Sequence, residues 1–372
     1  MSENIHKLDN LKDCKELSTS ELLMKLSAIP GPSGHEDEVM DYIKNIMVHY
    51  SDEIFRTPMG SLVCVKKGQE ADSPKVGFFA HADQIAFTVV KTYDDGFLRI
   101  ASVGGWDPKA VISQKVIIHT KKRKMRGIVG FMPPHLQTTE ESKKVPDYDH
   151  LFIDVTMNPD WKDIQIGDLV TIDTTGFEKN GLIYSLALDN RASCAAIIKA
   201  AQLITKMKVN AEVYYIFSTQ EEIGGPGAKS AAYLSDIEYG IVVDVTHGDE
   251  DIPGYPKIRI NEGPAIATGP VTNREFVDFI RKTAGKYNIK TQIEPIPGRS
   301  GTDTDEVQLT RMGVKTALIS IPLKYMHNPF EKISVSDVEE TAKLFAFTAF
   351  ELENLIESQQ NSKNSKNSKE GI

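Results

Sequence analysis

Short apolar runs alternate along this chain with longer amphipathic segments. The apolar runs, bounded by turn residues, are typical of strands buried on both faces. They include KVGFFA from Lys75, EVYYIFSTQ from Glu212, GIVV from Gly240 and KTALISIP from Lys315. Helical periodicity predicts two helices between Ser20 and Tyr50, with Ser33 as a candidate cap of the second, and further helices over residues 191–207, 276–287 and 334–357.

The pattern changes between about residues 87 and 175. Short β runs such as FLRIASV, KVIIHT and DLVTIDT, separated by Gly, Pro and Asp turns, predict a small β-rich, barrel-like domain. We therefore expect an α/β fold: a mixed, mostly parallel sheet with helices on both faces, interrupted by this insertion. The predicted domains are a discontinuous catalytic domain over residues 1–86 and 176–357, the insertion over 87–175, and a disordered polar tail over 358–372 that repeats NSK.

Composition narrows the classes of protein. The chain has 372 residues, of which 40% are hydrophobic and 26% charged, as expected for a globular protein larger than one typical domain. Its net charge of −9 argues against nucleic acid as a partner, because phosphate backbones require clustered basic residues.

The cellular location is predicted from the sequence features of signal peptides, membrane-spanning segments and disulfide-forming cysteines. The start, MSENIHKLDNLKD, has no apolar core of a signal peptide, and no run reaches the roughly 18 apolar residues that span a bilayer. Cys14, Cys64 and Cys194 show no paired spacing, which favours a reducing compartment. We expect a cytoplasmic protein without a membrane partner.

The candidate chemistry lies mostly near the ends of the apolar runs. Ligands bind beyond the carboxyl ends of the strands of an open α/β sheet, so side chains distant in sequence can meet there. Five ligands exceed the three of a typical catalytic zinc site, but they suit two ions that share one carboxylate about 3.5–4 Å apart. We expect two divalent ions, with Zn²⁺ or Co²⁺ favoured and Mn²⁺ an alternative, and no organic cofactor. The candidate ligands are His81, Asp189, Glu222, Asp244 and His327.

Three carboxylates are given more specific roles. Asp189 is the best bridge, because it directly precedes a predicted helix at a turn where both oxygens could face the crevice. Glu221 is left without a metal and is the natural general base. An EE pair is usually a solvated helix face, but this one follows a strand-like run and precedes GGPGA, which favours a sharp turn. Asp83 is expected to accept the second N–H of His81.

These residues belong to segments that resemble a known family. The chain is similar to the glutamyl and deblocking aminopeptidases, the dinuclear metallopeptidases that build TET-type tetrahedral particles. The similarity spans roughly residues 20–355. The matching segments are AHADQIAF around His81, GIVGFMPPH from Gly127, SLALDNRASCAA around Asp189, STQEEIGGPGA around Glu221, VVDVTHGDEDIPG around Asp244, SGTDTDEVQLTRMGV from Ser300 and ISIPLKYMHNPFE around His327.

The resemblance implies an activity and an assembly. It implies that His81 and Asp244 hold one metal, that Glu222 and His327 hold the other, and that Asp189 bridges them. Glu221 would act as the base in removing the amino-terminal residue from short peptides. The family's inserted domain makes dimer contacts, and dimers build a dodecamer, so we expect self-association of this chain.

Three positions depart from a frequent family pattern. Asn190 stands where many members have a second Asp, Gln84 replaces a frequent Glu, and Lys324 stands where an Arg often precedes Tyr325. None is a predicted ligand, and Asn190 is expected next to the ligands. An ammonium cannot reproduce a bidentate guanidinium contact. Metal preference and rate are therefore the properties that these departures would alter.

Three alternative functions remain open from the sequence. A related dinuclear deacylase would use the same ligands on N-acyl amino acids, which lack a free amine. A glycoside hydrolase would need two carboxyl groups about 5–9.5 Å apart and no metal. A catalytically impaired assembly homologue would retain the fold alone, although the presence of Glu221 and all five ligands weighs against it. The preferred amino-terminal residue is not predicted.

Overall fold

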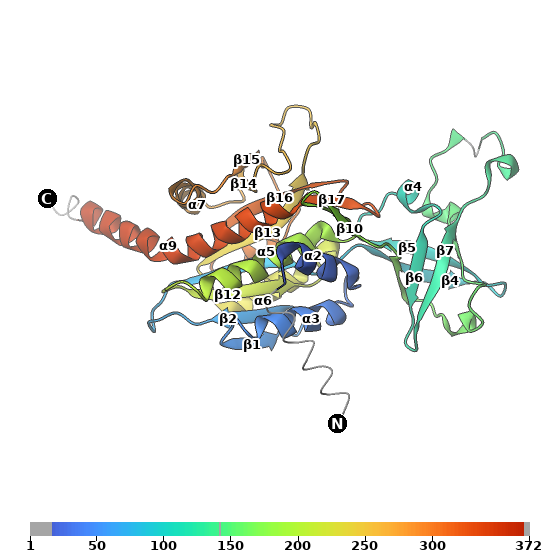
Figure 1. Cartoon of the computed structure of the whole chain (residues 1–372), viewed down its shortest axis with the longest axis horizontal. Coiled ribbons are helices and arrows are strands. Elements are labelled where there is room, and N and C mark those ends of the chain that lie inside the picture. The colour runs from blue at the N-terminus through green and yellow to red at the C-terminus, as the bar shows by residue number, and fades with distance from the viewer. Residues whose placement is uncertain (1–16, 141–142, 368–372) are drawn as a thin grey trace, which may run out of the picture.

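The computed structural model describes residues 17–140 and 143–367. These residues form a large layered sheet domain with a smaller barrel at one side (Figure 1). None of the described helices is long and apolar enough to cross a membrane.

The large sheet has 11 strands and a parallel centre. Its order is β1-β2-β12-β3-β13-β16-β17-β11-β10, with β14 paired to β15 and β16. The four central strands, β12, β3, β13 and β16, run parallel, and antiparallel strands flank them. The strands are β1 (Glu53–Arg56), β2 (Leu62–Lys66), β3 (Lys75–His81), β10 (Phe177–Lys179), β11 (Leu182–Ser185), β12 (Glu212–Ser218), β13 (Tyr239–His247), β14 (Ala265–Thr268), β15 (Gln292–Pro295), β16 (Lys315–Lys324) and β17 (Glu331–Ser334).

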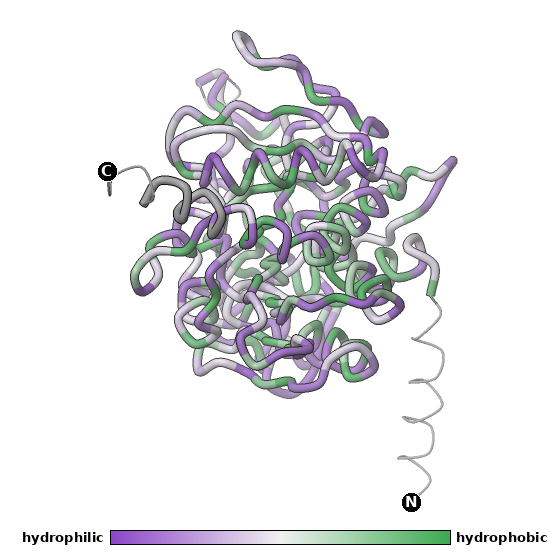
Figure 2. The backbone as a smooth tube through the Cα atoms, turned by 90° about the vertical axis from the view of Figure 1, so that its left-hand side faces the viewer, coloured by the Kyte–Doolittle hydropathy of each residue, from purple (hydrophilic) through white to green (hydrophobic). Residues whose placement is uncertain are grey.

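Helices cover both faces of this sheet because its central strands are apolar on both sides. Phe78 packs in one core cluster and Phe79, its neighbour on β3, in another on the opposite face. The first face packs against α2 (Thr19–Ala28), α3 (Asp37–Met47), α5 (Leu188–Ile204), α7 (Arg274–Lys286) and α9 (Val335–Asn367), and the second against α6 (Pro226–Ser235) and α8 (Thr304–Val307). Hydrophobic and hydrophilic residues are interspersed along the backbone (Figure 2), whereas α5 is buried along nearly its whole length.

The barrel is inserted between β3 and β10. Its six strands close in the order β4-β5-β8-β7-β6-β9 around a separate apolar cluster that includes Phe87, Leu98 and Val170. The strands are β4 (Ala86–Thr92), β5 (Phe97–Val103), β6 (Lys115–His119), β7 (Lys124–Gly130), β8 (Phe152–Asp154) and β9 (Leu169–Ile172), and α4 (Pro108–Val111) lies between β5 and β6.

The structure confirms the predicted fold class and differs in two local features. Ser33 does not cap α3, because its hydroxyl donates instead to Asp83 at 2.6 Å. Helix α9 continues to Asn367, where a disordered tail was predicted from Ser358. No Pro or Gly interrupts that stretch to stop the helix. Residues 368–372 of the predicted tail lie outside the described part of the chain.

Candidate metal centre

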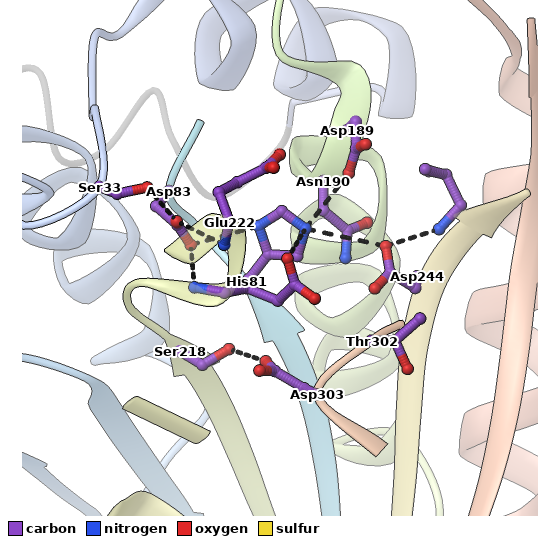
Figure 3. Close-up of polar contacts among 12 residues, drawn as sticks. Ser33, His81, Asp83, Asp189, Asn190, Ser218, Glu222, Asp244, Thr302 and Asp303 are labelled. Atoms are coloured by element: carbon purple, nitrogen blue, oxygen red, sulfur yellow. Dashed lines mark hydrogen bonds and ion pairs between the residues drawn. The ribbon is translucent and has the colours of Figure 1, made fainter. Parts of the chain in front are cut away.

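All five predicted ligands and Glu221 lie together at one edge of the sheet. Figure 3 shows four of them, His81, Asp189, Glu222 and Asp244. The parallel strands bring their carboxyl ends to this edge, which is where an α/β sheet binds ligands. His81 ends β3, Asp244 lies on β13, and Asp189 lies at the start of α5. Glu221 and Glu222 form a short 3-10 helix after β12, and His327 lies between β16 and β17.

Asp189 lies between the two imidazoles. Its Oδ1 is 3.2 Å from His81 Nε2, and its Oδ2 is 3.4 Å from His327 Nε2. His81 Nε2 also lies 3.7 Å from Asp244 Oδ1, and His327 Nε2 lies 3.5 Å from Glu222 Oε1. The side chains therefore form two ligand groups that share Asp189, one with His81 and Asp244 and the other with Glu222 and His327.

The turn after β12 aims the two glutamates at this cluster. Gln220 has a left-handed backbone, with φ of 60°, and Gly224 follows with φ of 115°. Such conformations are unusual for residues other than glycine and are often found at functional sites. A Cβ on Gly227 would lie 2.3 Å from the Thr219 carbonyl oxygen, so only glycine fits this return to α6. The GGPGA sequence thus serves the sharp turn that the sequence predicted.

Asp83 fixes the backbone of that turn. Its Oδ1 accepts the Glu221 N–H at 3.0 Å, and its Oδ2 accepts the Glu222 N–H at 3.2 Å and the Ser33 hydroxyl. Asp83 Oδ1 also lies 3.3 Å from His81 Nδ1, although that nitrogen makes no hydrogen bond of good geometry among the residues described. The sequence predicted a role for Asp83 beside His81, but it missed the contact with both glutamates.

Glu36 supports the same turn from the segment before α3. Its Oε1 accepts the N–H groups of Gly34 at 2.7 Å and of Gln220 at 3.2 Å. Burial raises the pKa of Glu36 to about 7. The sequence analysis missed this residue, since a glutamate at a predicted helix start reads as an ordinary favourable charge.

Glu331 is a second buried acid that sequence reasoning missed. Its Oε2 accepts the Asp189 N–H at 3.0 Å, and its Oε1 accepts the His327 N–H at 2.9 Å. The residue is only 2% exposed, and burial raises its pKa well above the usual range. It therefore joins two predicted ligands from different parts of the chain. The signal available in the sequence was its position at the start of a short strand, four residues after His327.

The three departures from the family pattern have their own contacts. Asn190 Nδ2 donates to the Val243 carbonyl oxygen at 2.9 Å, a bond that an ionised aspartate could not make. This bond ties the start of α5 to the strand that carries Asp244. Gln84 Oε1 accepts the Gly31 N–H at 3.1 Å, and the Lys324 ammonium lies 5.3 Å from the Tyr325 ring centroid.

The electrostatics of the cluster are dominated by buried carboxylates. Burial, reinforced by the charge of Asp189, raises the pKa of both Glu222 and Asp244. Burial also raises the pKa of Glu221 to about 10, with further contributions from Asp244 and other neighbouring acids. Burial favours neutral His327, but contacts with Asp189 and Glu222 outweigh it and raise its pKa to about 11. These shifts reflect four carboxylates gathered around two imidazoles, whose contacts instead lower the pKa of Asp189.

The donor set fits divalent metal ions. Within the described residues, the ion pairs of the five side chains are made with one another, Asp83 and Glu221, and no Lys or Arg is among their partners. Buried Asp189 Oδ1 accepts no hydrogen bond from any residue that the structure describes. Carboxylate oxygens and imidazole nitrogens suit Zn²⁺, Co²⁺ and Mn²⁺. A bound cation would neutralise the carboxylates and lower their pKa values.

A cavity of about 440 Å³ opens onto this cluster. Beyond the metal-capable residues it is lined by Gly105, Val245, Thr246, His247, Glu294, Ile296, Ser300, Gly301, Thr302, Leu318, Ser320 and Met326. The barrel has a cavity of similar volume, about 460 Å³, between β5, β8 and the 131–150 segment. None of the metal-capable groups of the described chain lies in that second cavity, so we place the candidate site in the first.

Comparison with known proteins shows the family of the chain. Residues 60–344 match the family described as M42 glutamyl aminopeptidase. The lysyl aminopeptidase of Pyrococcus furiosus is 34% identical over 335 residues, covering 87% of this chain and 94% of that protein.

Solved structures share the fold over most of the chain. One described as a putative peptidase/endoglucanase is 42% identical, with a TM-score of 0.75, over 90% of this chain and all of that chain. The TET1 peptidase of Pyrococcus horikoshii, described as assembling into a tetrahedron or a large octahedral shell, is 27% identical with a TM-score of 0.80. That match covers 90% of this chain and 100% of the other.

We expect Glu331→Gln to weaken metal binding and activity by about 10- to 100-fold, as for other residues that orient ligands. The carboxylate of Glu331 accepts hydrogen bonds from two backbone N–H groups. The amide would turn its N–H₂ group toward one of them, and two donors cannot bond to each other. Titration calorimetry of metal-free protein with Zn²⁺ measures the effect. Glu357→Gln, the same change on an exposed part of α9, is the control. Equal affinities in the two variants would refute this role for Glu331.

Proposed function

The chain belongs to the M42 glutamyl aminopeptidase family, and on that premise we propose that it is a two-metal aminopeptidase. Its substrates are short peptides, from which it removes the amino-terminal residue. The observation that carries the two-metal part is the position of Asp189, whose two oxygens face different imidazoles. A carboxylate in that position suits a bridge between two ions.

Each ion has three candidate ligands. His81, Asp244 and Asp189 would hold one, and Glu222, His327 and Asp189 would hold the other. Asp83, Glu331 and Asn190 support these ligands through backbone contacts, so the site is organised before an ion binds. When bound, such ions polarise the scissile carbonyl and make water acidic enough to attack near neutral pH.

Glu221 is proposed to move the proton. Its carboxylate accepts a proton from the attacking water and returns it to the nitrogen of the leaving amine. Glu221 is not needed in either group that shares Asp189, and its Oε2 lies 3.9 Å from His81 Nε2, at the edge of the cluster. Asp83 holds its backbone N–H, which limits the directions in which its side chain can point.

Two other activities deserve a direct comparison. A deacylase of N-acyl amino acids would use the same ligands on blocked substrates. Glycoside hydrolysis is the second alternative, because one similar structure is described as a putative peptidase/endoglucanase. A glycosidase usually needs two carboxyl groups, whereas this cluster gathers four acids around two imidazoles. That composition favours metal-dependent hydrolysis.

Self-association through the barrel is a further part of the proposal. The Pyrococcus horikoshii TET1 peptidase forms tetrahedral or octahedral particles, and the barrel of this chain exposes large apolar side chains. Leu136 is 64% exposed, Val145 67% and Ile166 68%. Exposed apolar surface of this kind favours contact with another protein surface.

Hydrolysis of aminoacyl-p-nitroanilides tests the activity. We expect chelator-treated protein to be inactive and added Zn²⁺, Co²⁺ or Mn²⁺ to restore cleavage of unblocked substrates, because the buried acids require a cation. Blocked substrates and carboxymethyl cellulose are the controls. Cleavage of N-acyl amino acids alone would indicate the deacylase, and chelator-resistant cleavage of cellulose would indicate a glycosidase.

Glu221→Gln should lower kcat by about 10²- to 10⁴-fold, the usual contribution of a general base. Because Glu221 is not proposed as a ligand, the variant should still bind two ions per chain. Atomic absorption after gel filtration measures the metal content. The neighbouring Glu222→Gln should instead lose metal. A loss of metal in Glu221→Gln would make Glu221 a ligand and overturn its role as base.

Sedimentation velocity tests the assembly. We expect particles much larger than the 41.3 kDa chain, and we expect Ile166→Glu to shift them toward smaller species because it charges the exposed barrel surface. Met312→Glu, on a fully exposed residue outside the barrel, should leave the particle size unchanged. A wild-type monomer would refute self-association.

A further inference from the structure

One acid in the cavity is left over after the metal cluster and the base are assigned. Glu294 lies on β15 and lines the cavity beside Thr246, Ser320 and Ile296. It belongs to neither ligand group that shares Asp189. The role of this carboxylate is therefore separate from the chemistry proposed above.

Hydroxyl groups hold Glu294 next to the metal cluster. Ser320 Oγ donates to its Oε2 at 2.5 Å, and Thr246 Oγ1 donates to its Oε1. Ser320 pairs with Asp244 across the parallel strands β16 and β13, and Thr246 lies two residues after Asp244 on the same face of β13. The carboxylate is thus fixed one side chain beyond a proposed ligand.

Glu294 has no Lys or Arg partner in the described chain, and the one basic group that acts on it is His247, which lines the same cavity and pairs with Glu250. Neither Lys nor Arg is among the described residues that line this cavity, and Glu294 forms no ion pair with any described residue. Its two bonds come from neutral hydroxyls, which leave further acceptor positions on both oxygens. Burial raises the pKa of Glu294, with the hydrogen bonds from Ser320 and Thr246 opposing that effect. A cation at this position would relieve the cost of the buried charge.

The neighbouring walls suit an aliphatic stem. Ile296, Leu318 and Met326 line the same cavity, whose volume of about 440 Å³ is within the range of small-ligand sites. Long basic side chains bury their methylene groups against apolar surface while the charged end meets a polar group. A carboxylate among apolar side chains therefore complements lysine or arginine.

Building on the proposed aminopeptidase activity, we propose that Glu294 receives the cationic side chain of the substrate's first residue. The enzyme then prefers peptides that begin with Lys or Arg. Ser320 and Thr246 position the carboxylate for this contact. An acidic first residue would meet Glu294 with no Lys or Arg in the described lining, so glutamyl substrates are disfavoured by charge repulsion.

Glu294 could instead bind the α-amine that all unblocked substrates share. The two roles differ in selectivity. A side-chain contact affects Lys and Arg substrates relative to Leu, whereas an α-amine contact affects every substrate alike. The ratio of kcat/KM values between Lys and Leu substrates therefore separates the two roles.

The experiment uses the metal-loaded full chain and p-nitroanilides of Lys, Arg, Leu and Glu, with kcat and KM measured separately. We expect the wild type to prefer Lys and Arg. In Glu294→Gln the Lys-to-Leu ratio of kcat/KM should fall by about 10- to 100-fold, mainly through KM, as expected for loss of a charged hydrogen bond. Glu294→Asp, which keeps the charge, should retain part of the preference. Glu262→Gln, on an exposed glutamate outside the cavity, is the control.

Each outcome has a distinct meaning. Wild-type preference for Leu or Glu, an unchanged ratio in folded Glu294→Gln, or an equal fall for all substrates would overturn the inference. If Glu294→Gln does not fold, the wild-type panel and Glu294→Asp decide it. Failure of metal-loaded wild type to cleave any unblocked substrate would overturn the proposed aminopeptidase itself.

Discussion

Concentration of negative charge in a buried volume is the constraint on which this structure depends. Asp189, Glu222 and Asp244 lie within reach of only two imidazoles, and Glu221 lies beside them. Buried carboxylates without compensation are costly, so the cluster must hold protons or bind cations. The raised pKa values of Glu221 and Glu222 and the raised pKa of His327 express the same imbalance. Two divalent ions would remove it and would also supply the hydrolytic chemistry of the family.

The position of this charge is set mainly by the backbone. Asp83 accepts the N–H groups of both glutamates, and Glu331 accepts those of Asp189 and His327. Buried acids that bind backbone groups cannot move without leaving donors unsatisfied. The proposed ligands therefore start from fixed backbone positions, and only their side-chain torsions remain to adjust. Gln220 and His327 both have left-handed backbone conformations, which are unfavourable for residues other than glycine. The surrounding contacts of the site hold the backbone in these conformations.

The sequence could predict the residues that gather at the ends of parallel strands. It could not predict the residues whose position depends on turns and on contacts between distant segments. Apolar runs identified the central strands, and parallel strand ends converge by geometry, so His81 and Asp244 were correctly placed at one edge. Glu331 and Glu36 act through backbone N–H groups on other segments, and no periodicity reveals such partners. Glu294 reaches the cavity only because β14 and β15 fold back beside β16. The predicted disordered tail from Ser358 is helical as far as Asn367, because low hydrophobicity alone does not end a helix.

The barrel has its own apolar core, but its chain connections and the segment after β5 lie next to the site. The chain enters it five residues after His81 and returns through β10 and β11 to Asp189, so two proposed ligands flank the insertion. The segment after β5 also reaches the cavity. A Cβ on Gly105 would lie 3.0 Å from His327 Nδ1, whereas one on Gly104 would first meet Ile85, at 2.6 Å. Gly105 therefore permits close approach to a proposed ligand. The insertion supplies part of the cavity wall without supplying a ligand, which links the barrel to the shape of the site.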